Sequence, residues 1–562
     1  MAVSGLLRKL RITSAAPDPA AQVRSRAAIA IGCFLIVYGV IGGRLVQYGM
    51  TGQEDASSYA ANDRSLASRP DIIDRNGDVL ATDIRVASLY GEPRRIVDAD
   101  EAVEALSTVL PDVDYKEWHR KLSSGAGFVW LRRELTPRQQ ADVLALGIPG
   151  IGFRTEKRRF YPGGPVASHI LGLVNIDNAG IAGLEKYIDD QGLGTMQDLG
   201  LDADAELPPV KLSMDARVQY IVRDELAAAM ERYRAIAAGG VVLNVRTGEV
   251  VAMASLPDFD PNNPFNALDK DRLNRMSAGV YEMGSTFKSF TTAMALDSGK
   301  VKITDTFNTD PFRVGGFTIK EFHSKNRPLS VPEIFEYSSN VGSAHEADVV
   351  GIEGHREFLT RMGLLSRLQT ELPEIASPTQ PKVWKKINSM TISFGHGVAT
   401  TPLNTAVATA ALMNGGYLIP PTFLTRTEED AQKLAKRVVS EKTSEQMRFM
   451  YNLNGTRGSG KQALVEGYGV GGKTGTAEKV VNGRYVGDKR FNAYLASFPI
   501  DNPLYVVLVV VDEPKPVPGS GQGATAASNA APTAGAIIRR AAPLLGIMPK
   551  FGDGDGALLV SY

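Results

Sequence analysis

Three short segments of this sequence carry side chains that could transfer an acyl group. The first is Ser285-Thr-Phe-Lys288, the second is Ser338-Ser-Asn340, and the third is Lys473-Thr-Gly-Thr476. A serine and a lysine three residues apart lie on one face of a helix, so the amine can reach the hydroxyl and act as its base. Together the segments predict a serine nucleophile with its base, a second hydroxyl, an amide and a second cation.

The side chains of the first two segments have expected roles in moving protons. Lys288 must be neutral to accept the proton of Ser285, and burial together with a nearby cation such as Lys473 would lower its pKa. Ser338 is expected to pass a proton to the leaving amine. Asn340 is expected to hold an amide of the substrate.

Backbone and side-chain groups of the same segments are expected to hold the reacting carbonyl and the end of the substrate. The backbone N–H groups of Ser285 and Thr476 would form an oxyanion hole, in which the loss of one donor costs about 10²–10³ in rate. A terminal carboxylate would bind to the last segment, which consists of Lys473, Thr474, Gly475 and Thr476. The site therefore fits a peptide that ends in a free carboxylate and is cleaved by acyl transfer.

Each segment taken alone also has a simpler interpretation. The Ser-x-x-Lys pattern arises by chance in long chains, and Ser324-Lys-Asn326 matches the second pattern as well. Serine and asparagine commonly cap helices or form turns. The catalytic interpretation is favoured by the order and wide spacing of the segments, from residue 285 through 338 to 473.

The composition narrows the classes of protein to which the chain can belong. Its 562 residues are enough for about two or three domains. The 62 basic residues balance the 62 acidic ones, so charge gives no reason to expect nucleic acid as a partner. A single cysteine, Cys33, excludes a disulfide framework, and the six scattered histidines lack the spacing of a zinc site. We expect neither a metal nor a cofactor.

An apolar stretch near the start of the chain predicts a membrane anchor. Residues 27–43 are uncharged and almost wholly apolar, and residues 27–50 could span a bilayer if Arg44 extends its charge to the interface. Basic residues precede the stretch, so the positive-inside rule places residues 1–26 in the cytoplasm and the rest of the chain outside. A cleaved signal peptide is the alternative, but no clear cleavage site follows.

The elements expected around the three segments form two folded parts. Residues 52–205 mix strands, turns and helices, with a hairpin turn at 74–78 and helices at 102–110 and 137–146. For residues 206–548 we expect strands at 240–244, 250–255, 471–478, 492–498 and 505–511, helices at 218–232, 285–298 and 534–545, and a loop at 519–533. This order predicts an α+β fold with one five-stranded antiparallel sheet flanked by helices, followed by a tail at 549–562.

The sequence resembles the class B penicillin-binding proteins over nearly all of its length after the apolar stretch. Beyond the three segments, the matching motifs are Arg69–Gly77, Arg159–Pro162, Gly180–Glu185, Leu212–Asp215, Thr247–Glu249, Ser393–Gly397 and Thr401–Leu403. Two residues depart from the family pattern. Met283 stands where proline usually precedes Gly-Ser, and Pro70 stands where glycine usually follows the first arginine. Both changes affect local backbone rigidity more than chemistry.

The resemblance assigns roles to the residues of the three segments. It implies that Ser285 is the acylated serine and that Lys288 is its base. The middle motif corresponds to Ser338 and Asn340, and the last motif corresponds to residues 473–476.

The resemblance also implies an architecture and an activity. A transmembrane helix would precede an elongated pedestal domain at 52–205 and a penicillin-binding transpeptidase domain at 206–548. The implied enzyme is a D,D-transpeptidase that cross-links peptidoglycan stem peptides ending in D-Ala-D-Ala, and β-lactams would inhibit it covalently. No cofactor is implied.

One motif bears on the biological role. Residues Ser338–Gly342 are similar to those of division-specific enzymes, the penicillin-binding protein 3 type. This similarity implies septal cell-wall synthesis at the bacterial cytoplasmic membrane. The implied partners are a glycosyltransferase of the shape, elongation, division and sporulation (SEDS) family and other divisome proteins.

Other functions share much of this pattern. A D,D-carboxypeptidase or a β-lactamase uses the same acylation step, and the motifs barely encode what attacks the acyl-enzyme. An elongation-type transpeptidase is a further alternative within the family. A non-enzymatic antibiotic sensor or divisome scaffold is the alternative from another class, although a sensor would need more than residues 1–26 on the cytoplasmic side. We expect a transpeptidase that releases bound penicillin slowly.

Overall fold

The computed structural model describes residues 31–32, 34–43, 69–193, 207–481, 483–520 and 524–551. The chain divides into two units, residues 1–63 and residues 64–562. In the first unit the described residues are helical, and the other residues of the predicted tail and anchor at 1–50 lie outside the described ranges. Across the described ranges, no helix is both long enough and apolar enough to cross a membrane.

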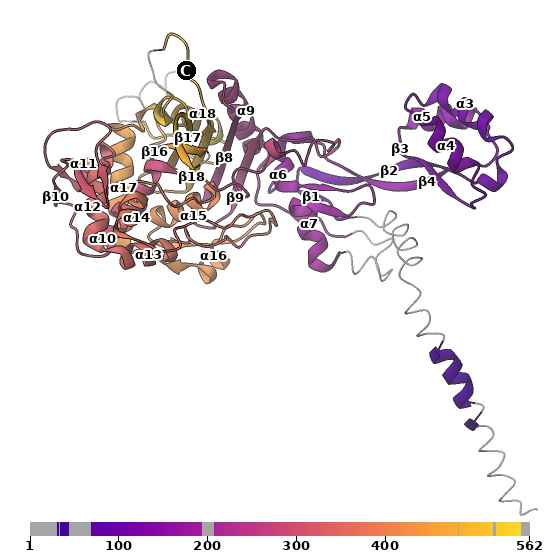
Figure 1. Ribbon diagram of the computed structural model, residues 1–562, viewed down its shortest axis with the longest axis horizontal. Helices are drawn as coiled ribbons and strands as arrows, with labels where there is room; N and C mark the ends of the chain where they lie inside the picture. Colours follow the sequence, from indigo (N-terminus) through magenta and orange to yellow (C-terminus); the bar gives the residue numbers. More distant parts are fainter. Residues whose placement is uncertain are drawn as a thin grey trace, which may run out of the picture. The chain divides into compact units, whose positions relative to one another are not determined.

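The second unit contains the five-stranded antiparallel sheet that the sequence predicts (Figure 1). Its strands, in spatial order, are β16 (Gly471–Val481), β17 (Arg484–Phe498), β18 (Tyr505–Asp512), β8 (Ala237–Asn244) and β9 (Val250–Leu256). Neighbouring side chains of β18 enter different cores, Val506 one and Val507 the other. Both faces of β18 are therefore buried, which explains its continuous apolar sequence.

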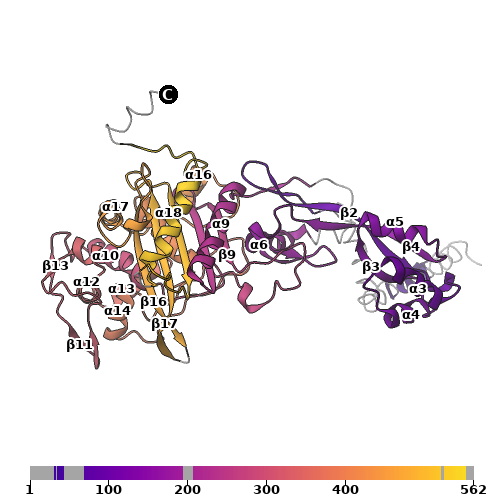
Figure 2. The same cartoon turned by 90° about the horizontal axis from the view of Figure 1, so that it is seen from above.

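Helices cover both faces of this sheet (Figure 2). On one face lie α9 (Ala216–Tyr233) and α18 (Ala530–Ala541), and on the other lie α10 (Lys288–Asp297), α15 (Pro402–Met413) and α17 (Glu441–Thr456). The predicted bounds of α18 are wrong at both ends. The side chain of Asn529 accepts the N–H of Ala530 and starts the helix inside the predicted loop. Pro543, which has no N–H, follows closely after its last residue.

The segment between β9 and β16 is mostly helical, as predicted. Besides α10, α15 and α17 it contains α11 (Val331–Glu336), α12 (Asn340–Val350), α13 (Ile352–Arg361), α14 (Lys386–Ser393) and α16 (Glu428–Leu434). Its short strand pairs are β10 (Thr306–Phe307) with β13 (Leu329–Ser330), β11 (Phe312–Val314) with β12 (Phe317–Ile319), and β14 (Tyr417–Leu418) with β15 (Lys436–Arg437).

The part of the second unit before α9 is organised around the long strand β2. β2 (Val79–Gly91) pairs with β1 (Ile72–Ile73), β3 (Val129–Leu135) and β4 (Ile151–Phe160), and β1 pairs with β7 (Val210–Lys211). Among the described residues of this part, the α-helices are α3 (Ala99–Val109), α4 (Tyr115–Leu122), α5 (Pro137–Ala145), α6 (Ser168–Leu171) and α7 (Gly183–Ile188). The predicted turn between β1 and β2 is confirmed, and Gly77 adopts φ of +98° in it.

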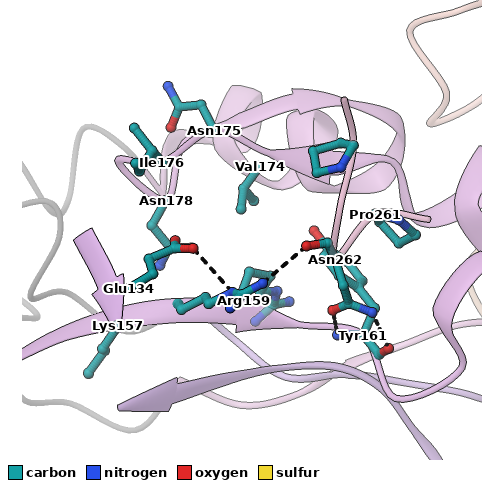
Figure 3. Close-up of a pocket in the computed structure, with 12 residues that line it drawn as sticks. Glu134, Lys157, Arg159, Tyr161, Val174, Asn175, Ile176, Asn178, Pro261 and Asn262 are labelled. Atoms are coloured by element: carbon teal, nitrogen blue, oxygen red, sulfur yellow. Dashed lines mark hydrogen bonds and ion pairs between the residues drawn. The ribbon is translucent and has the colours of Figure 1, made fainter. Parts of the chain in front are cut away.

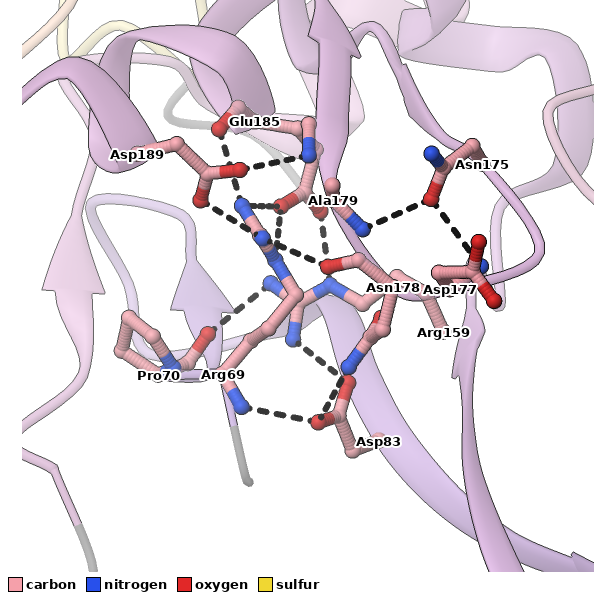
Figure 4. Close-up of polar contacts among 11 residues, drawn as sticks. Arg69, Pro70, Asp83, Arg159, Asn175, Asp177, Asn178, Ala179, Glu185 and Asp189 are labelled. Atoms are coloured by element: carbon pink, nitrogen blue, oxygen red, sulfur yellow. Dashed lines mark hydrogen bonds and ion pairs between the residues drawn. The ribbon is translucent and has the colours of Figure 1, made fainter. Parts of the chain in front are cut away.

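A buried ion network joins the ends of β4 and α7 to the start of this part (Figure 4). Arg159 donates to Glu185 at 2.6 Å and to Asp83 at 3.2 Å. Arg69 donates to the same Glu185 at 2.9 Å and forms an ion pair with Asp189 at 2.6 Å. The side chains of both arginines and of Glu185 are almost completely buried, so removing one partner leaves a charge without compensation.

We expect the substitution Arg159→Met to lower the free energy of unfolding by about 3–5 kcal/mol, because it removes the ion pairs to Asp83 and to Oε1 of Glu185 and leaves the buried Glu185 with Arg69 alone. Denaturant unfolding of the full-length chain measures this loss. The matched control is Arg138→Met, since Arg138 is 93 % exposed and lies 3.9 Å from Asp142. Its effect should stay below about 0.5 kcal/mol, and equal effects of both substitutions would contradict the prediction.

A cavity of about 180 Å³ lies beside this network, where β4 meets the loop that follows β9 (Figure 3). Arg158 pairs with Glu134 at 3.3 Å and donates to the carbonyl oxygen of Asn262 at 3.0 Å. The side chain of Asn262 accepts the N–H of Tyr161 at 3.0 Å and donates to its carbonyl oxygen at 2.9 Å. These bonds connect the part before α9 to the part that contains the sheet.

Candidate active site

Ser285 lies in the 3₁₀ turn η5 (Gly284–Phe287), which leads directly into α10 at Lys288. In a 3₁₀ turn side chains three residues apart eclipse each other, so Ser285 and Lys288 lie on the same side. The sequence predicts an α-helix from residue 285, whereas the observed first turn is a tighter 3₁₀ turn. Gly284 precedes the serine with φ of +53°, a backbone conformation that favours glycine.

Strand β16 packs directly against this turn. A Cβ atom at Gly475 would clash with the carbonyl oxygen of Met283, and one at Gly284 would lie 2.9 Å from the carbonyl oxygen of Thr476. Glycine is therefore required at both positions for the strand to approach the turn. This approach brings the backbone of Thr476 beside that of Gly284, the residue before Ser285.

Ser338 lies between the two lysines, just before α12, which begins at Asn340. Nζ of Lys288 donates to the carbonyl oxygen of Ser338 at 2.5 Å and to Oδ1 of Asn340 at 2.7 Å, and it lies 3.1 Å from Oγ of Ser338. Nζ of Lys473 lies 2.9 Å from the same Oγ. Ser338 adopts φ of +56°, a strained conformation that costs on the order of 1–3 kcal/mol outside glycine. The three sequence segments thus meet at one hydroxyl.

Burial lowers the pKa of both lysines. Lys288 is 1 % exposed and Lys473 is fully buried. Burial, and then the positive charge of Lys473, hold the pKa of Lys288 well below its ordinary value. Burial lowers the pKa of Lys473 to about 7. Both causes favour the neutral amine at Lys288, which is the form that a base needs.

The hydroxyl of Ser338 can link the two amines in only one direction at a time. It has one proton to donate, so it donates to one amine while it accepts from the other. A neutral Lys288 can accept that proton while the ammonium of Lys473 donates to the oxygen. Ser338 is therefore placed to carry a proton across the site.

The hydrogen bonds of Lys288 differ from the simplest expectation. Within the part of the chain that the structure describes, its amine bonds to Ser338 and Asn340, and no hydrogen bond joins it to the Ser285 hydroxyl. Catalytic hydrogen bonds are often long in a site without substrate and shorten when substrate binds.

The residues expected to bind a carboxylate already have protein partners. The hydroxyl of Thr474 lies 2.6 Å from that of Ser459, which stands in the turn after α17. The hydroxyl oxygen of Thr476 accepts the N–H of Ala526 at 3.1 Å and keeps its own proton to donate. Ser459 was missed in the sequence analysis, because nothing in its surroundings connects it to the third segment.

Glu321 is a further residue of the site, and no sequence pattern predicts it. Its carboxylate accepts the N–H of Asn340 at 3.0 Å, the N–H of Val341 at 3.2 Å and the hydroxyl of Ser339. An acid at the start of α12 satisfies N–H groups that have no partner inside the helix. Its negative charge also raises the pKa of Lys288, against the stronger effect of burial. A single glutamate in a polar loop gives no signal in the sequence.

We expect Glu321→Gln to slow acylation by penicillin about tenfold, because a hydrogen bond to a charged group contributes about 1.5–3 kcal/mol. Loss of the carboxylate loosens the start of α12, which carries the middle motif. Second-order acylation rate constants of the full-length chain measure the effect. Glu353→Gln, at an exposed position in the first turn of α13, is the control and should match the unsubstituted chain. Equal rates for both variants would refute the role of Glu321.

The site and the fold together define a class of protein. Acyl transfer needs a nucleophile, a neutral base and N–H donors for the oxyanion. Here η5, α10, α12 and β16 bring together a serine, buried lysines and a second hydroxyl, which are groups of the kinds that this reaction needs. An antiparallel sheet flanked by helices that carries this arrangement is typical of the penicillin-recognising serine acyl-transferases.

The chain belongs to the family of penicillin-binding protein transpeptidases. Residues 238–539 match the family model of the penicillin binding protein transpeptidase domain. Residues 64–196 match that of the penicillin-binding protein dimerisation domain. These matches confirm the resemblance that the motifs indicate.

Individual relatives are similar over most of the chain. The chain is 40 % identical over 493 residues to the probable peptidoglycan D,D-transpeptidase FtsI of Caulobacter vibrioides. The aligned region covers 86 % of this chain and 82 % of that protein. It is 34 % identical over 471 residues to the probable peptidoglycan D,D-transpeptidase PenA of Neisseria meningitidis, covering 80 % of each. It is 30 % identical over 524 residues to the peptidoglycan D,D-transpeptidase FtsI of Escherichia coli, covering 87 % of each.

Proposed function

We propose that this chain is a peptidoglycan D,D-transpeptidase that works through an acyl-enzyme on Ser285. The observation that carries the proposal is the position of the Ser338 hydroxyl, 3.1 Å from the amine of Lys288 and 2.9 Å from that of Lys473. The buried amines of Lys288 and Lys473 share this hydroxyl close to the 3₁₀ turn that carries Ser285. This arrangement can move a proton from the nucleophile to the leaving group. The names of the relatives support the same reaction.

Acylation follows from the roles proposed for these groups. Oγ of Ser285 attacks the carbonyl carbon between the last two D-alanines of a stem peptide, and its proton passes to the neutral amine of Lys288. The N–H groups of Ser285 and Thr476 stabilise the negative oxygen of the tetrahedral intermediate. The C–N bond then breaks, and the departing D-alanine amine receives a proton through Ser338. The products are an ester on Ser285 and free D-alanine.

Substrate binding is assigned to the third motif and to the amide of the second. Lys473, Thr474 and Thr476 hold the terminal carboxylate, and Gly475 lets the strand approach the nucleophile. Asn340 holds an amide of the stem peptide. A β-lactam presents a carboxylate beside a strained amide, so it acylates Ser285 in the same way. Its ring nitrogen stays attached to the acyl group, and the adduct therefore blocks the site.

The experiment that tests this function is intact-mass analysis of the full-length chain after treatment with penicillin. A stable one-to-one adduct supports a transpeptidase that deacylates slowly. Penicillin consumed without an accumulating adduct would indicate a hydrolase, such as a D,D-carboxypeptidase or a β-lactamase. The absence of both adduct and consumption on folded protein would indicate an inert scaffold.

We place this activity in septal wall synthesis at the bacterial cytoplasmic membrane. The name FtsI of two relatives and the sequence of Ser338–Gly342 support the division-specific role over an elongation-type one. The apolar stretch supports a single-pass anchor at 27–50 behind a cytoplasmic tail at 1–26. The proposed partners are a SEDS glycosyltransferase and other divisome proteins.

We assign the domain bounds as follows. A pedestal domain extends over residues 52–205, a transpeptidase domain over residues 206–548, and a tail over residues 549–562. The two family matches, at 64–196 and 238–539, lie inside the proposed domains and support this division.

A further inference from the structure

Glu346 is an acid buried inside the transpeptidase fold, on the same helix as Asn340. Its side chain is fully buried. The hydroxyl of Thr292 on α10 donates to its Oε2 at 3.1 Å. Its other oxygen, Oε1, is buried without a hydrogen-bond partner among the described residues. A carboxyl group with a single hydrogen bond and no contact with water is costly to ionise, so Glu346 retains its proton at neutral pH.

The same two helices hold Glu346 and the proposed base. Thr292 follows Lys288 by one helical turn and lies on the same face of α10. Lys288 in turn bonds to Asn340, the first residue of α12, on which Glu346 also lies. A negative charge on Glu346 raises the pKa of Lys288, and the positive charge of Lys288 lowers the pKa of Glu346. Burial is the larger effect and raises the pKa of Glu346 to about 8.

Other titratable side chains near this pair do not act on Glu346 in the same way. On α12, α13 and α14 they are His345, Asp348, His355 and Lys386. Burial lowers the pKa of His355 to about 4, so this histidine is neutral. Asp348 and Lys386 pair with each other at 2.8 Å and are both exposed. Burial also lowers the pKa of His345. Among these side chains, the ammonium form of Lys288 is the one that lowers the pKa of Glu346.

We propose that Glu346 is a positioning residue whose charge sets the strength of Lys288 as the base of the site. This inference rests on the proposed function, in which Lys288 takes the proton of Ser285. While Glu346 keeps its proton, the pair is uncharged and Lys288 keeps its lone pair. Once Glu346 has released its proton to solvent, its negative charge stabilises the ammonium that forms when Lys288 accepts the proton of Ser285. No atom of Glu346 needs to touch the substrate.

The expected sign of the pH effect follows from this arrangement. Glu346 ionises as the pH rises through about 8, and a base that is stabilised in its protonated form accelerates proton transfer. We expect the ratio of acylation rate constants, unsubstituted chain over Glu346→Gln, to rise about threefold between about pH 6.5 and about pH 9.5. Lys473 also titrates in this range, but it does so in both proteins and cancels in the ratio.

The test measures second-order acylation by penicillin across this pH range on the full-length chain and three variants. Glu346→Gln keeps the shape of the side chain and cannot ionise. Asp348→Asn removes an exposed acid from the same helix. The ratio of acylation rate constants, unsubstituted chain over Asp348→Asn, should therefore stay constant across the pH range. Thr292→Val removes the hydrogen bond that favours the ionised carboxylate, so the rise should move to higher pH. The inference would be overturned if the ratio of rate constants for Glu346→Gln stayed constant with pH. It would also be overturned if this ratio rose only as much as the ratio for Asp348→Asn.

A spectroscopic measurement separates this inference from the proposed function. The carbonyl stretch of a protonated carboxyl group is absent from carboxylates, so infrared difference spectra of the unsubstituted chain and Glu346→Gln report the proton directly. We expect this band at neutral pH and its loss above about pH 8. A chain that shows the band without being acylated overturns the proposed function. A chain that is acylated without the band overturns the role of Glu346 alone.

Discussion

Replacing Ser285 by alanine should abolish the covalent adduct with penicillin in the full-length chain. The substitution removes the only oxygen that the proposed mechanism makes nucleophilic, while Gly284 and the 3₁₀ turn keep the fold. Intact-mass analysis after penicillin treatment measures the result.

The control for this experiment is Ser298→Ala. Ser298 lies just after the last residue of α10, where its hydroxyl donates to the carbonyl oxygen of Ala295 at 2.7 Å. This variant should form the adduct like the unsubstituted chain. An adduct that persists in Ser285→Ala would show that another residue is acylated and would refute the assignment of the nucleophile.

Replacing Lys288 by methionine should slow acylation by about 10²–10⁴, the usual contribution of a positioned base. Methionine fills much of the buried space but cannot accept a proton. It also leaves the carbonyl oxygen of Ser338 and the amide oxygen of Asn340 without the bonds that Lys288 makes to them. Rates of adduct formation, followed by mass over time, measure the loss.

The pH dependence identifies the cause of that loss. The pKa of Lys288 is lowered, so the amine is neutral above that lowered pKa, and acylation of the unsubstituted chain should fall as the pH drops through it. The methionine variant should lack this fall. Lys300→Met, which removes an exposed lysine bonded to a backbone carbonyl, is the control and should keep both rate and pH profile. A Lys288→Met rate within about tenfold of the unsubstituted chain would argue against a general base at this position.

Local sequence patterns predicted most of the regular structure and singled out the three segments of the proposed active site. The strands β8, β9 and β18 are apolar runs bounded by turn residues, and such runs predict strands. The strand predicted at 492–498 matches only the apolar second half of β17, because its first half, from Arg484 to Arg490, is mostly polar. The segments at 285–288, 338–340 and 473–476 were recognisable because serine, lysine and asparagine at these spacings suit one reaction. Local spacing could not show that all three meet at the Ser338 hydroxyl, which depends on how α12 and β16 pack.

By itself, the sequence determined the class of fold, the family and the side chains able to perform acyl transfer. Only the tertiary structure decided the partners of Lys288, the tight turn at Ser285 and the presence of Glu321 and Glu346 near the base. The physical reason is that burial and charge coupling depend on helices distant in sequence. A lone glutamate has no periodicity that reveals which helix will cover it, yet its burial decides whether it carries a charge.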